Sequence, residues 1–180
     1  MQSPVRVTRV DGKSSREDDD VLVVEEPLEI RLGEKPVSVT LRTPGDDFDL
    51  AAGFLFTESI LRSGSEIASI RHWGSPNVVR VALQEGVKVD LQRLQRHFYS
   101  TSSCGVCGKT SIDAVRVHTT ALDGTFDVNA DVVASLPDTL RAQQKTFEST
   151  GAIHGAGIFA SDGTLLRMRE DVGRHNAVDK

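Results

Sequence analysis

The sequence contains few cysteines, few aromatic residues and no long hydrophobic run. Only two of its 180 residues are cysteine, too few to supply the several disulfides that staple a small secreted domain. No apolar stretch approaches the ~20 residues needed to cross a bilayer. The polar segment 1–20 also lacks the apolar core of a signal peptide. We therefore expect a cytoplasmic protein with reduced thiols and no membrane span.

Positive charge is also scarce. The net charge is −5 and the pI is near 5.5, whereas neutralising nucleic-acid phosphates requires a basic surface. This balance argues against nucleic acid as the main partner. The remaining composition, 38% hydrophobic and 26% charged residues, is ordinary for a globular protein, and the chain is long enough for one substantial core or two small lobes.

Alternating apolar and polar residues predict a sheet in the first half of the chain. Segments 28–32 and 37–41 alternate on either side of a turn at 33–36, which predicts a β-hairpin with one buried face. Segment 1–20 is charged and has no apolar periodicity, so we expect it to be a disordered tail. We define residues 21–99 as a sheet-rich N-terminal lobe. Its other expected elements are a helix over 50–61 and strands over 78–83 and 87–91.

The second half of the chain has a different residue pattern. Small and polar residues form a loop over 100–109 that holds both cysteines, and residues 110–180 form a further lobe. The elements expected after the loop are a helix over 109–117, a helix over 131–147 bent or restarted at Pro137, a hairpin over 152–168, and the opening turn of a helix from Arg174. The fold class is therefore α+β, with a sheet-rich lobe followed by the start of an α/β lobe.

The most informative motif is the cysteine pair Cys104 and Cys107, with Gly105 and Gly108 interleaved. Two sulfurs at this spacing share a tight loop and can reach each other, and the glycines leave them uncrowded. Lys109 and the positive end of a following helix would favour a thiolate. A thiolate is the form that attacks sulfur, binds metal or carries a persulfide.

Four interpretations of the pair remain open at this point. Two small buried residues in a turn is the simplest. Structural zinc needs four ligands, and the five histidines are scattered along the chain, so we expect no metal. A thioredoxin-like dithiol shares the Cys-Gly-X-Cys form, but such motifs follow an early strand, not about a hundred residues of mostly sheet. In the fourth interpretation one cysteine carries a terminal persulfide and the other assists its release.

A second constellation combines basic and small residues near the end of the sequence. Gly173 precedes Arg174, His175 and Asn176 at an expected helix start, and Lys180 closes the motif. Guanidinium, imidazole and ammonium groups suit a phosphate or another anion. His154, among the small residues 150–157, is a weaker candidate, since a close-packed strand with a satisfied histidine explains it equally well.

Taken together, the motifs resemble a known family. They are segments 26–30, 42–47, 52–58, 103–108 and 170–180, in this order, and they are similar to those of the formate dehydrogenase accessory sulfurtransferases, the FdhD family. The resemblance spans residues 21–180. The last motif, Glu-Asp-Val-Gly-Arg-His-Asn-Ala-Val-Asp-Lys, is the most specific.

The resemblance implies a sulfur carrier. Such a protein takes sulfur from a cysteine desulfurase and passes it to a molybdenum or tungsten cofactor bearing two pterin guanine dinucleotides, before that cofactor enters formate dehydrogenase. By this resemblance Cys104 would carry the persulfide with Cys107 as its partner. From their chemistry, Arg174, His175 and Lys180 are the candidates to contact the cofactor, with His154 a weaker one. A dithiol oxidoreductase and a non-catalytic cofactor chaperone are the alternative functions.

The resemblance also implies a cytidine-deaminase-like second lobe without deaminase chemistry. Gly155 and Ala156 follow His154 where a deaminase has His-x-Glu, and no proline precedes the cysteine pair. Family members continue beyond the motif that ends at Lys180, so we expect this chain to be truncated there, with an incomplete cofactor site. Apolar residues left uncovered would then favour pairing with another chain, including a homodimer.

Overall fold

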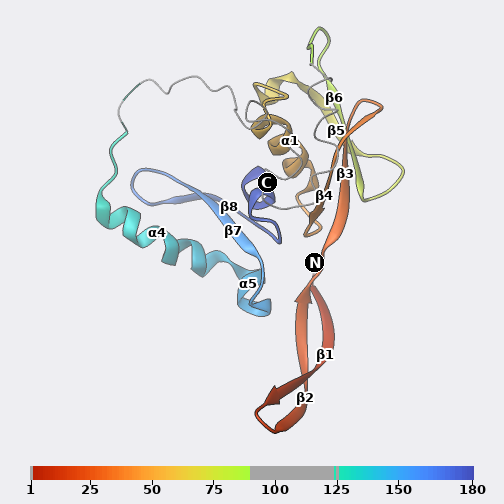
Figure 1. The fold of residues 1–180 in the computed structure, drawn as a ribbon. Coiled ribbons are helices and arrows are strands. Elements are labelled where there is room, and N and C mark those ends of the chain that lie inside the picture. Colours follow the sequence, from red (N-terminus) through yellow and green to blue (C-terminus); the bar gives the residue numbers. More distant parts are fainter. Residues whose placement is uncertain (1, 90–123, 125) are drawn as a thin grey trace, which may run out of the picture.

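The computed structural model describes residues 2–89, 124 and 126–180. A hairpin arm, a four-stranded sheet with one helix, and a helix-flanked two-stranded sheet follow one another along the chain (Figure 1). Strands and helices are therefore both present but largely segregated, which confirms the α+β class expected from the sequence. Among the described helices, none has the length and apolar character needed to cross a membrane.

The four-stranded sheet has the order β4-β3-β6-β5. Strands β3 (Glu26–Leu32) and β4 (Lys35–Arg42) form the expected hairpin, joined by a two-residue turn in which Gly33 has φ +59°. This left-handed backbone conformation favours glycine, because glycine has no Cβ that would clash. Strand β6 (Val78–Leu83) runs parallel to β3, and β5 (Ile67–His72) pairs antiparallel with β6 at the edge.

The hydrophobic core lies between this sheet and helix α1 (Asp47–Thr57). Alternate residues of β3 and β6 point toward the helix and are buried, whereas their neighbours lie on the outer face. α1 contributes Leu50, Ala51 and Leu55, all at most 1% exposed. Burying a side chain of this size contributes about 1.5 to 3 kcal/mol. The other buried core residues are Leu28, Ile30, Leu32, Val37, Leu61, Val79 and Val81.

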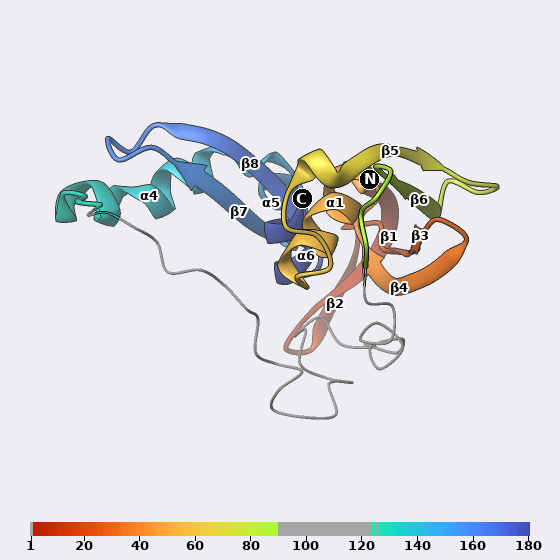
Figure 2. The same ribbon diagram turned by 90° about the horizontal axis from the view of Figure 1, so that it is seen from above.

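The second half is built on the hairpin of β7 (His154–Phe159) and β8 (Leu165–Asp171). Helix α4 (Ala130–Gln143) lies along one face of it, where a Cβ at Gly157 would come within 2.9 Å of Leu140. The short helix α6 (Arg174–Asp179) packs between this hairpin and α1. Figure 2 shows the same arrangement from above, with β7 and β8 over α4 and α6 beside α1.

The expected restart of the helix at Pro137 is wrong, and a bend there stays a prediction. Helix α4 continues through Pro137, and the interruption falls at Gln144, before α5 (Lys145–Thr150). Proline removes one backbone donor, but α4 is exposed and solvent can satisfy the freed carbonyl. At the actual break the carboxylate of Glu170 accepts hydrogen bonds from the backbone N–H groups of Thr146 and Phe147, both at 3.1 Å. This anchors the first turn of α5 to β8.

The expectation of a disordered tail over residues 1–20 is also wrong. Strands β1 (Gln2–Asp11) and β2 (Ser14–Val23) form a two-stranded arm that projects from the sheet (Figure 1). Its charges pair across the strands instead of repelling: the guanidinium of Arg9 donates to Asp18 and Asp20, both at 2.9 Å. Cross-strand pairs of opposite charge stabilise an exposed hairpin that has no core of its own.

Two further differences concern the edge of the four-stranded sheet. Strand β5 was not expected from the sequence, and residues 87–89, the described part of the strand expected over 87–91, contain no strand. β5 has a register shift between Ile67 and Ser69, which breaks the two-residue period that reveals a strand. The helix expected over 109–117 lies outside the described residues.

Candidate functional site

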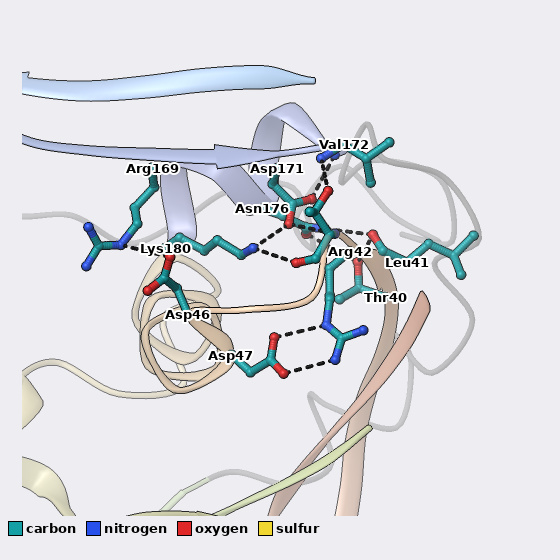
Figure 3. Close-up of polar contacts among 12 residues, drawn as sticks. Thr40, Leu41, Arg42, Asp46, Asp47, Arg169, Asp171, Val172, Asn176 and Lys180 are labelled. Atoms are coloured by element: carbon teal, nitrogen blue, oxygen red, sulfur yellow. Dashed lines mark hydrogen bonds and ion pairs between the residues drawn. The ribbon is translucent and has the colours of Figure 1, made fainter. Parts of the chain in front are cut away.

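The motif at the end of the chain is organised around a buried carboxylate, that of Asp171, the last residue of β8. It is 0% exposed and accepts four donors. Oδ1 accepts from the backbone N–H of Gly173 at 2.8 Å and from the side-chain amide of Asn176 at 3.0 Å. Oδ2 accepts from the backbone N–H of Thr43 at 3.0 Å and pairs with the ammonium of Lys180 at 2.8 Å (Figure 3).

Thr43 joins this motif to the first half of the chain. Its hydroxyl accepts from the backbone N–H of Val172 at 3.1 Å, and its carbonyl accepts from the Lys180 ammonium at 2.8 Å. Because β4 ends at Arg42, Thr43 sits where the four-stranded sheet passes into α1. We call Thr43, Asp171, Asn176 and Lys180 the Asp171 cluster. It ties the end of β8 and α6 to the end of β4.

Asn176 completes the connection. Its amide nitrogen also donates to the carbonyl of Leu41 at 2.8 Å, and its amide oxygen accepts from the Thr40 hydroxyl at 3.2 Å. The side chain therefore uses both its donor and its acceptor ends on residues of β4 and on Asp171. A buried polar group with every partner supplied by the protein stabilises one arrangement of the two halves.

A second buried ion pair lies directly below the cluster in Figure 3. The guanidinium of Arg42 donates twice to the carboxylate of Asp47, at 2.9 Å each, and once to the amide oxygen of Asn77 at 3.0 Å. This bidentate geometry is the strongest that arginine forms with a carboxylate. This pair fixes the start of α1 relative to β4.

Helices α1 and α6 approach each other closely at Gly53. A Cβ built there would lie 1.8 Å from the carbonyl oxygen of Asp179, so only glycine allows this contact. The carboxyl group of Asp179 accepts a hydrogen bond from the Thr57 hydroxyl at 2.9 Å. The pKa of Asp179 is raised to about 6. Burial is the main cause of the raised pKa and the charge of Glu58 adds to it, whereas the Thr57 hydrogen bond and the charge of His175 act in the opposite direction.

The structure places the expected anion-contact residues in two different environments. Arg174 and His175 are exposed on the first turn of α6, and His154 is exposed opposite Asp171 in the β7–β8 register. The side chain of Lys180 is only 2% exposed and is engaged by Asp171 and Thr43. In this arrangement Lys180 holds the fold together, and an anion would reach its ammonium only if the Asp171 cluster opened. A cofactor contact at any of the four residues stays a prediction.

The predicted thiol site, Cys104 and Cys107, lies outside the described residues. Within residues 2–89 and 126–180 there is no group of three or more histidine, cysteine, aspartate or glutamate side chains placed to hold a metal ion. The expectation that the protein holds no zinc stays a prediction, since a test of it must include the cysteines.

Sequence reasoning did not identify the structural roles of Asp171, Asn176 and Thr43. The first two lie inside the motif 170–180 and Thr43 inside the motif 42–47. A signal was available in the sequence, because Asp171, Asn176 and Lys180 place a carboxylate, an amide and an ammonium group at spacings of five and four residues. These groups can satisfy one another as readily as they can bind an anion.

The chain is similar to known proteins over most of its length. A family model described as FdhD/NarQ matches residues 23–180. "Sulfur carrier protein FdhD" of Streptomyces coelicolor is 49% identical over 174 residues, covering 89% of this chain and 61% of that protein. The protein of the same name in Mycolicibacterium paratuberculosis is 47% identical over 186 residues, covering 97% of this chain and 68% of that protein.

A solved structure shows the same fold. The crystal structure of a protein described as a formate dehydrogenase accessory protein, from Desulfotalea psychrophila, superposes with a TM-score of 0.72 at 20% identity, over 99% of this chain and 66% of that one. The present chain spans about 61% of the length of the Streptomyces coelicolor relative. By its family model and by relatives at nearly half identity, the chain belongs to the FdhD/NarQ family.

Proposed function

We propose that this chain is the sulfur-carrying part of a protein that loads sulfur onto the cofactor of formate dehydrogenase. The observation that carries the proposal is that the only two cysteines form one glycine-flanked pair, Cys104 and Cys107, in a chain 49% identical to a protein named as a sulfur carrier. A sulfur carrier needs a thiol nucleophile, and the chain has no other.

The loading step is an exchange between sulfur atoms. The thiolate of Cys104 attacks the terminal sulfur of a persulfide on a cysteine desulfurase, forming a new S–S bond as the donor's S–S bond breaks. The donor cysteine leaves as a thiolate and takes up the proton, so Cys104 ends as a persulfide. The exchange needs no external oxidant or reductant.

The delivery step uses the second cysteine. The thiolate of Cys107 attacks the inner sulfur of the persulfide, forming a Cys104–Cys107 disulfide and releasing the outer sulfur as hydrosulfide to the client cofactor. A cellular dithiol then reduces the disulfide. The client, a molybdenum or tungsten bis(pterin guanine dinucleotide), is a substrate here. Arg174 and His175, exposed on α6, are the proposed contacts to its phosphates, and His154, at the start of β7, is a further candidate.

Mass spectrometry of the intact protein tests the proposal. After incubation with a cysteine desulfurase and cysteine, the protein should gain about 32 Da, the mass of one sulfur, in a form that a reductant removes. The Cys104→Ser variant should gain nothing, whereas Cys107→Ser should gain the sulfur and retain it. Equal loading of the Cys104→Ser variant would contradict the assignment.

The mass measurement and an activation assay separate the alternative functions. A dithiol oxidoreductase would reduce a protein disulfide without any desulfurase and would gain no mass. A chaperone that only holds the cofactor would tolerate Cys104→Ser in a formate dehydrogenase activation assay, which a sulfur carrier would not.

A further inference from the structure

The outer face of the four-stranded sheet, on the side away from α1, carries a row of arginines. Arg31 of β3 pairs in register with Arg80 of β6, and Arg80 pairs with Arg71 of β5. Residues paired in register share a face, and the neighbours Ile30, Val79 and Val81 are buried against α1. The three guanidinium groups therefore lie side by side across adjacent strands, about 4.8 Å from one strand to the next.

Like charges in register oppose sheet formation, and the protein offsets this only in part. Glu29 pairs with Arg31, and Glu34 pairs with Arg80. The guanidinium of Arg71 lies over the ring of Trp73, 5.2 Å from its centroid. Two carboxylates thus face three arginines, and the Nε of Arg80 is buried without a hydrogen-bond partner in the described structure.

The same face offers apolar surface next to this charge. Trp73 is 42% exposed and is also contacted by the guanidinium of Arg80, 4.5 Å from the ring centroid. On the far side of the row, Val39 and Leu41 of β4 are 50% and 55% exposed, and they pair with the outer-face residues Glu29 and Pro27. Exposed tryptophan and arginine beside aliphatic side chains is the composition of the centre of a protein interface.

We propose that this face docks a segment of another protein that combines carboxylates with apolar side chains. Its carboxylates would pair with Arg71 and Arg80, and its apolar residues would cover Trp73, Val39 and Leu41. A protein segment fits better than a small phosphate ligand, because the charges are spread along a row across three strands with apolar surface on both sides. The proposal goes beyond sulfur carriage and does not depend on it.

The tryptophan makes this face measurable. Trp73 is the only tryptophan in the sequence, so intrinsic fluorescence reports on this surface alone. The probe is a peptide of about eight residues that alternates glutamate and leucine, long enough in extended form to cross the row. We expect saturable quenching or enhancement of Trp73 fluorescence, with an affinity that falls as salt rises.

Charge reversal provides the decisive comparison. Arg71→Glu should weaken binding of the glutamate–leucine peptide at least about tenfold and create binding of a lysine–leucine peptide of the same length. The matched control is Arg167→Glu, an exposed arginine on β8, which should change neither affinity by more than about twofold. Arg71→Glu should still load sulfur on Cys104, so failure here is distinguishable from failure of the proposed function.

Each other outcome overturns the proposal. Absence of saturable binding up to about 1 mM peptide would mean that the face does not recognise acidic segments. Displacement of the peptide by inorganic phosphate or GDP at similar concentration would assign the row to a phosphate ligand. Conversion of a dimer into a monomer by Arg71→Glu, seen by analytical ultracentrifugation, would assign the face to a second copy of this chain.

Discussion

The two halves of the described structure are stabilised by different interactions. In the first half, α1 and the four-stranded sheet enclose a continuous apolar core. In the second half, α4 and α5 have no buried residue, and burial is concentrated at the end of β8 and in α6, at Asp171, Gly173, Asn176 and Ala177. The first half can therefore tolerate the loss of one polar contact, whereas the second half depends on the Asp171 cluster for its position.

This contrast changes the interpretation of the motif 170–180. From sequence alone, its charged residues indicate an anion site. In the structure, Asp171, Asn176 and Lys180 satisfy one another and the end of β4. Arg174 and His175 are the part of the motif that faces outward. One short segment thus positions itself with three side chains, and two of its basic side chains remain exposed to solvent.

The largest effect should follow removal of the central carboxylate. Asp171→Ala leaves the Lys180 ammonium buried without a carboxylate partner, with only the Thr43 carbonyl, and removes the acceptor for Gly173, Asn176 and Thr43. Breaking a buried pair in this way costs about 3 to 5 kcal/mol. Urea unfolding followed by circular dichroism measures the loss.

The control for that experiment is Asp162→Ala in the turn between β7 and β8, where the fully exposed carboxylate makes only local hydrogen bonds, among them one from the backbone N–H of Thr164 at 2.9 Å. We expect a change of no more than about 1 kcal/mol. If the two variants unfold at the same urea concentration, the Asp171 cluster does not hold the halves together.

An intermediate effect should follow from adding a methyl group at the close contact between α1 and α6. Gly53→Ala would place a methyl group 1.8 Å from the backbone of Asp179, so α6 must shift. Alanine favours a helix interior by about 1 kcal/mol, and the overpacking opposes this with about 1 to 3 kcal/mol. We expect a lower thermal midpoint.

Gly64→Ala is the matched control, because a Cβ there would meet nothing within 4 Å. It should leave the thermal midpoint unchanged within a degree or two, about what a near-neutral surface substitution gives. A rise in the midpoint of Gly53→Ala would show that α6 does not pack on α1 as described.

The two halves also differ in how far the sequence predicts them. The alternation of β3 and β4, the helical spacing in α1 and the hairpin of β7 and β8 are local signals, and these elements form close to where they are expected. Helix α1 begins and ends earlier than expected, at Asp47–Thr57 instead of 50–61. The arm and β5 were not predicted because neither shows a regular alternation of apolar and polar residues. Opposite charges pair across β1 and β2, and a register shift interrupts β5. Period and propensity cannot reveal either feature.

The candidate site is harder to predict for the same reason. Asp171 meets Thr43 across 128 positions in the sequence, and no spacing rule relates them. The sequence does identify the two motifs that contain these residues, and it does not reveal that they face each other. It also cannot separate the inward-facing Lys180 from the outward-facing Arg174, since both are basic residues of one motif.

The smallest effect concerns Asp179, at the contact between the halves, and depends on pH. Its pKa is raised to about 6 in the folded protein, above the ordinary value of about 3.9 in an unfolded chain. Between these values the folded state binds more protons at Asp179 than the unfolded state does, so the stability that this group contributes is fully present below about pH 4 and is lost as the pH rises through 6. Allowing for solvent screening, the loss is about 1 to 2 kcal/mol.

Two substitutions test this origin by unfolding at a series of pH values. Asp179→Asn removes the titrating group, so the fall in stability contributed between pH 4 and 6 should disappear. Thr57→Val removes the hydrogen bond that lowers the pKa of Asp179, so the upper end of the fall should move above pH 6. A pH profile that both variants leave unchanged would mean that Asp179 is as solvated as an ordinary surface carboxylate, and that α6 does not bury it against α1.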